Sequence, residues 1–102
     1  MTARQQAEEC LRRVRGNGPT DTCRTLLLQA AEHLRTDRPG HEMWEAVRVY
    51  LARRLSGDRF RDDLAAADDA REQFLTHAPV VRAGQTRGEY ALLLDRAAGA
   101  GR

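Results

Sequence analysis

Few residues in this sequence are able to do chemistry, and none stands at the spacing of a reactive motif. His41 and Glu45 lie four residues apart, which on a helix places two potential metal ligands on one face. The second histidine of an HExxH pattern is missing, and no third ligand stands nearby. We therefore expect no metal site, and we interpret Glu45 as part of a polar first turn that favours the positive end of a helix.

The two cysteines, Cys10 and Cys23, are the candidate nucleophiles. Cys10 falls on an apolar helix face, where burial raises a thiol pKa and keeps the group inert. Cys23 stands in the predicted first turn of a helix beside Arg24, and both features favour the thiolate, but no base can be placed next to it. We predict no catalytic residue and no cofactor. Buried free thiols are favoured over a disulfide, because reduced cysteines are usual in the cytoplasm.

Arginine supplies all 17 basic residues, and neither lysine nor isoleucine occurs. This bias is typical of a high-GC bacterium such as an actinomycete. The formal net charge is only +2, so charge alone does not indicate a polyanionic partner.

Two hypotheses give the arginines a function. One is an anion site around a predicted tight turn at residues 56–58, formed by Arg53, Arg54, Arg59 and Arg61. The other is a DNA-associated regulator that uses Arg12, Arg13, Arg15, Arg53 and Arg59. Aspartates interleave with the first set, and over residues 58–72 six carboxylates oppose three arginines. Phosphates would be repelled there, so nucleic-acid binding is the weaker alternative.

Two further arginines interrupt apolar helix faces. Arg54 falls among the apolar residues of one predicted helix, and Arg71 falls among those of the next. A buried unpaired charge costs several kcal/mol, so we expect both side chains to reach solvent or a carboxylate such as Asp63. The alternative is a pocket for a small acidic ligand, in a binding protein or helper enzyme, lined by Trp44, Tyr50, Arg54 and Arg71.

The elements that position these residues are helices. Leucine and alanine dominate the apolar residues, and only five residues are aromatic. Apolar spacing predicts helices over residues 3–15, 21–36, 41–55, 58–77 and 87–98. Predicted N-caps are Thr20 or Asp21 for the second helix and Ser56 or Asp58 for the fourth, and Thr86 with Glu89 forms a capping box.

The fold class that follows is all-α. We predict an up-and-down bundle of four main helices plus a short C-terminal helix, in one domain over residues 1–102 with a possible flexible tail at 99–102. The helix over 41–55 is the expected centre of the core, with Trp44 and Tyr50 inside it. No apolar run approaches the roughly 20 residues of a membrane span, and no secretory leader is visible, so we expect a cytoplasmic protein.

Some apolar residues fall outside the inward faces, namely Leu28, Val49 and Leu92. If such residues converge, they form a patch that favours a protein partner or a second copy in a homodimer. The sequence therefore predicts a small, non-enzymatic interaction or regulatory domain that acts through apolar helix faces with a charged rim.

Overall fold

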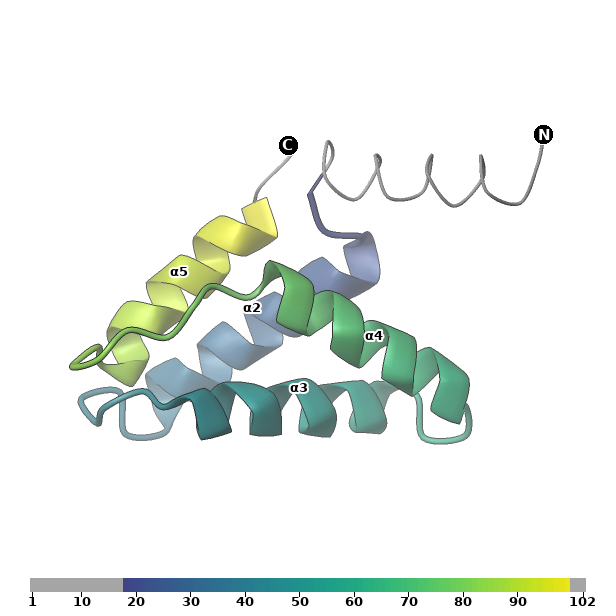
Figure 1. Ribbon diagram of the computed structural model, residues 1–102, viewed down its shortest axis with the longest axis horizontal. Coiled ribbons are helices and arrows are strands. Elements are labelled where there is room, and N and C mark those ends of the chain that lie inside the picture. Colours follow the sequence, from purple (N-terminus) through teal and green to yellow (C-terminus); the bar gives the residue numbers. More distant parts are fainter. Residues whose placement is uncertain (1–17, 100–102) are drawn as a thin grey trace.

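The computed structural model describes residues 18–99, and the helix predicted over residues 3–15 lies outside this range. The described part contains four α-helices and no strand: α2 (Asp21–Thr36), α3 (Glu45–Arg59), α4 (Leu64–His77) and α5 (Arg87–Gly99) (Figure 1). This confirms the all-α class. The up-and-down arrangement stays a prediction, and α5, with 13 residues, is nearly as long as α4, with 14.

The central helix is α2, which begins and ends where the sequence predicts. Thr20 is its N-cap, because the hydroxyl oxygen accepts a hydrogen bond from the Cys23 N–H at 3.2 Å. Its buried face is formed by Cys23, Leu26, Leu27, Ala30, Ala31 and Leu34. This helix packs most extensively on α5 and also contacts α3 and α4. The prediction that residues 41–55 form the centre of the core was therefore wrong.

Helix α3 begins at Glu45 instead of residue 41, because the preceding segment is held in an extended pairing. The Met43 N–H donates to the Gln85 carbonyl at 2.7 Å, and the Arg87 N–H donates to the His41 carbonyl at 2.8 Å. These bonds join the start of α3 to the start of α5, far apart in the sequence. They give the Met43 N–H and the His41 carbonyl partners outside α3, so these backbone groups are satisfied without helix.

The tight turn predicted at residues 56–58 is wrong, because α3 continues through Ser56, Gly57 and Asp58 to Arg59. These three residues lower helix propensity by roughly 2 kcal/mol together relative to alanine. Ser56 is buried, however, and tertiary packing outweighs intrinsic propensity. The N-cap of α4 is consequently Asp63, whose carboxylate accepts from the Ala66 N–H at 3.0 Å.

Three arginines from neighbouring elements bind the C-terminal ends of other helices. Arg48 of α3 donates to the carbonyl of Leu75 at 2.6 Å near the end of α4. Arg24 donates to the Ala98 carbonyl of α5 at 3.0 Å, and Arg87 donates to the carbonyl of Asp37, which caps α2, at 3.3 Å. The last carbonyls of a helix lack partners and carry partial negative charge. These guanidinium groups therefore hold the helices to one another.

Several large residues predicted to be inside lie at the surface. The exposed fractions are 59% for Trp44, 50% for Tyr50 and 81% for Leu64. Helix α3 turns Leu51 and Ala52 toward the core, so Tyr50 lies on the opposite side. Leu64 is the first residue of α4, and its side chain is largely uncovered by the other helices.

Candidate interaction surface

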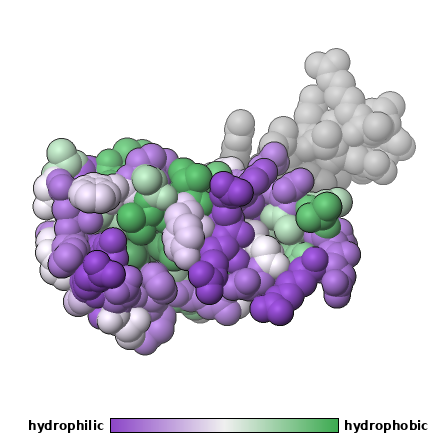
Figure 2. All heavy atoms as spheres, turned by 90° about the horizontal axis from the view of Figure 1, so that it is seen from below, coloured by the Kyte–Doolittle hydropathy of each residue, from purple (hydrophilic) through white to green (hydrophobic). Residues whose placement is uncertain are grey.

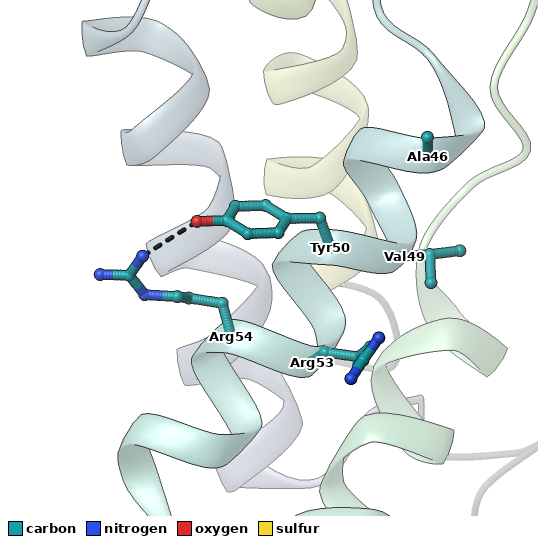
Figure 3. A pocket seen from close by; sticks show the side chains of 5 residues that line it. All are labelled: Ala46, Val49, Tyr50, Arg53 and Arg54. Carbon is teal, nitrogen blue, oxygen red and sulfur yellow. Dashed lines mark hydrogen bonds between the residues drawn. The ribbon is translucent and has the colours of Figure 1, made fainter.

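The outward side of α3 carries a hollow of about 590 Å³. Among the described residues it is lined by side chains of this one helix, which we call the α3 outer face: Ala46, Val49, Tyr50, Arg53 and Arg54 (Figure 3). Their spacing of three and four residues places them on one side of the helix. The surface thus combines three exposed apolar side chains, those of Ala46, Val49 and Tyr50, with two arginines.

Arg54 and Tyr50 are joined on this face. The Arg54 Nη1 atom donates to the Tyr50 hydroxyl at 2.9 Å, as Figure 3 shows, and Arg54 Nε lies 3.4 Å from the Asp58 carboxylate. The hydrogen bond to Tyr50 is the main reason why the pKa of the Arg54 guanidinium is raised. Both side chains are exposed, so the bond orders the tyrosine ring without removing it from the surface.

Arg53 differs from Arg54 in its partners. It is exposed, and within residues 18–99 it forms no ion pair and no side-chain hydrogen bond. The fold of this range makes no use of its charge. Arg53 is therefore available to a carboxylate from outside the described part of the chain.

The face of the molecule that carries α3 is shown in Figure 2. Apolar atoms appear in the left and middle part of this view, on the side where α3 begins in Figure 1, with strongly hydrophilic residues beside them, and a smaller apolar group lies at the right end. An apolar patch with a polar rim is the usual anatomy of a protein-binding surface.

The other proposed ligand or anion residues lie elsewhere. Trp44 donates from its indole to the Glu42 carboxylate at 2.9 Å, and Arg71 lies 3.5 Å from Asp68. Neither lines the hollow on the α3 outer face. Asp68 is thus the carboxylate that Arg71 meets in place of Asp63. Of the predicted ligand pocket, the structure brings together only Tyr50 and Arg54.

The proposed interface residues are spread over three helices. Leu28 of α2, Val49 of α3 and Leu92 of α5 are all exposed, as the sequence suggests. Only Val49 lines the hollow. The interface role of all three stays a prediction, and Val49 is the one that shares a face with other candidate residues.

The arginines of the DNA hypothesis do not form one described surface. Arg12, Arg13 and Arg15 lie outside the described residues. Arg59 follows Arg53 by six positions, so the two stand about 120° apart around α3. Arg59 instead lies over the Phe60 ring, with its guanidinium carbon 5.9 Å from the ring centre, and lines a second hollow with Gln29 and His33.

Chemistry at Cys23 is opposed by its surroundings. The thiol is buried, and burial raises its pKa to about 11, while Arg24 lowers it by a smaller amount. At neutral pH this thiol is protonated and weakly nucleophilic. Arg24 lowers the thiol pKa as the sequence suggests, but the effect of burial is larger. Cys10 lies outside the described residues.

Metal ligation at His41 and Glu45 is also disfavoured by geometry. His41 precedes α3, so the two residues do not share a helical face. Glu45 Oε1 accepts from Arg48 at 2.7 Å. Within residues 18–99, no three histidine, cysteine, aspartate or glutamate side chains are grouped as ligands of a metal ion would be.

Within residues 18–99, no helix is both long and apolar enough to cross a membrane.

Sequence reasoning missed Ala46 as part of the α3 outer face. It stands three and four residues before Val49 and Tyr50, and this spacing was visible in the sequence. Because Tyr50 was expected in the core, the exposed set of Ala46, Val49 and Tyr50 was not predicted.

Comparison with protein families, with curated proteins and with solved structures found no match to this chain.

Proposed function

We propose that this protein is a small, non-enzymatic interaction or regulatory domain whose docking surface is the α3 outer face. The observation that carries the proposal is the position of Val49 and Tyr50 beside Arg53, all three exposed on one side of α3. Aromatic residues and arginines are the residues most enriched at the energetic centres of protein interfaces. A partner would bury Val49 and the tyrosine ring and place a carboxylate at Arg53.

A small-ligand pocket has less support on the same residues. Sites for small molecules are usually concave and enclose most of the ligand. The described lining of this hollow comes from one helix, with Arg71 and Trp44 elsewhere. A broad, open surface of this kind suits the side of another protein better than a metabolite.

Three finer expectations accompany the proposal. The cytoplasm is supported by Cys23, a free buried thiol of the kind usual in reducing compartments. An up-and-down order is supported by the contacts of Arg87 with the end of α2 and of Arg24 with the end of α5, which make these two helices antiparallel. A high-GC bacterial source is supported by the arginine bias alone.

The test is site-specific photo-crosslinking in the cells that produce the protein. A photoreactive phenylalanine derivative replaces Val49 in one variant and Leu64 in a matched control, since Leu64 is also apolar and exposed but lies on α4. We expect a defined protein adduct from position 49, identifiable by mass spectrometry, that is lost when Arg53→Glu is added. Equal labelling at both positions, or none at either, would contradict the proposal.

A further inference from the structure

The α3 outer face has a repeating pattern that continues toward the end of the helix. Ala46, Val49, Tyr50, Arg53 and Gly57 follow one another at intervals of three, one, three and four residues. This is the spacing of a helix side that packs along another helix. A Cβ atom added at Gly57 would meet nothing within 4 Å, so the stripe is open at this end as well.

Groups of opposite charge flank the N-terminal half of this stripe and stand within its C-terminal half: Glu45 precedes Ala46 by one residue, about 100° round the helix, and Arg53 precedes Gly57 by one turn. Near the N-terminal end is Glu45, whose side chain is 60% exposed and engages Arg48 through one of its two carboxylate oxygens. Toward the C-terminal end is Arg53, without an ion pair in residues 18–99. A second copy of the same face, turned end to end, therefore brings Glu45 of each copy to the same end of the contact as Arg53 of the other copy.

We propose that the occupant of the α3 outer face is a second copy of this chain, docked with its α3 antiparallel to the first. The inference rests on the proposed function and names the partner. A two-fold axis between Val49 and Tyr50 brings Arg53 of each copy level with Ala46 of the other copy. The long arginine side chain then reaches Glu45, one residue further along. Such a contact is isologous and closes at two copies.

Residue size and helix dipoles agree with this arrangement. Ala46 stands opposite the long Arg53 side chain, so a small residue faces a large one. The apolar centre consists of Val49 and Tyr50 from both copies, and the Arg54 hydrogen bond holds the tyrosine ring in place beforehand. Antiparallel helices also place the positive end of one dipole near the negative end of the other.

The length of the stripe indicates how strongly two copies should associate. Residues 46–57 span about 17 Å of helix, at 1.5 Å per residue. An interface of one helix side falls at the small end of specific protein contacts, so we expect reversible, concentration-dependent association with a Kd in the micromolar range or weaker.

The test is sedimentation equilibrium of the full chain between about 10 µM and about 1 mM, the range in which small interfaces associate. We expect a monomer–dimer equilibrium that weakens about tenfold or more in Arg53→Glu and in Val49→Glu. The first change places a carboxylate beside Glu45 of the other copy, and the second buries a carboxylate at the two-fold axis. The matched control Leu64→Glu should leave the equilibrium unchanged. Adding Glu45→Arg to Arg53→Glu should restore association, since the charges are then exchanged in both copies.

Two results would overturn the antiparallel dimer. One is a monomer across the whole concentration range, and the other is a dimer that Arg53→Glu and Val49→Glu do not weaken. Circular dichroism on each variant establishes that the helices are intact. If the chain stays monomeric while crosslinking at position 49 captures a different protein, self-docking fails and the proposed function stands.

Discussion

Arg48 shows how one side chain can serve several elements at once. Its guanidinium pairs with Glu45 on α3 and donates to two carbonyl oxygens, those of Leu75 and Ala78, at the end of α4. Its side chain is 14% exposed, so these contacts are mostly shielded from water. Hydrogen bonds to charged groups in such surroundings are stronger than those between neutral groups.

Replacing Arg48 should therefore destabilise the fold. We expect Arg48→Ala to lower the free energy of unfolding by about 1–3 kcal/mol, since it leaves the α4 carbonyls without their donor. Arg61→Ala is the matched control, because Arg61 is exposed and forms no ion pair within the described range; it should change stability by less than about 0.5 kcal/mol. Urea unfolding followed by circular dichroism measures both. Equal stability of the two variants would show that the Arg48 contacts contribute little.

Two buried groups should make the protein sensitive to alkali. Burial raises the pKa of the Cys23 thiol from 9.0 to about 11 and the pKa of the Tyr90 hydroxyl from 10.0 to about 12. Both groups are neutral when protonated, and the folded state favours that form. Their contribution to stability is complete below about pH 9 and is lost as the pH rises through about 11 and about 12.

Unfolding in urea at a series of pH values above neutrality checks this expectation. The free energy of unfolding should fall steadily from about pH 9 upward, and the fall should be shallower in Cys23→Ala, which lacks the thiol. A wild-type curve that stays flat to pH 11 would show that these groups are not buried as described.

At the scale of elements, the junction between α3 and α4 shows that tertiary packing, and not local residue type, decides where one helix ends and the next begins. The sequence predicts a cap at Ser56 or Asp58 from local residue types. The structure places the cap at Asp63, because the packing of Ser56 inside the fold carries α3 through the Ser-Gly-Asp segment. The helix propensities of these residues do not predict that α3 continues, since the surface against which Ser56 packs comes from other helices.

Substitutions at Asp63 and Asp58 test which of the two residues caps α4. We expect Asp63→Ala to cost about 0.5–2 kcal/mol of stability, because it removes the acceptor of the Ala66 N–H. Asp58→Ala should change stability by less than about 0.5 kcal/mol, since Asp58 makes only a surface pair with Arg54. Thermal or urea unfolding distinguishes the two. A larger loss in Asp58→Ala would favour the turn that the sequence predicts.

At the scale of the whole molecule, the sequence was informative where one helix could be read by itself. The limits of α2, the Thr20 cap and the capping box of Thr86 and Glu89 are all confirmed. These features depend on residues close together in the chain.

The predictions that were wrong concern features that depend on contacts between residues far apart in the sequence. Helix α3 starts late because Met43 pairs with Gln85, and the arginines that hold helix ends together act across 27 to 74 residues. Tyr50 was assigned to the core because its helix was expected to be surrounded by others. One side of α3 is instead exposed, and that is the side on which the proposed docking surface lies.

The most direct test of the account is the ratio of crosslinking at Val49 to crosslinking at Leu64 in living cells. If the α3 outer face is the docking surface, position 49 yields an adduct, position 64 does not, and Arg53→Glu abolishes the difference. Similar yields at the two positions, or an adduct at position 49 that survives Arg53→Glu, would contradict the central claim.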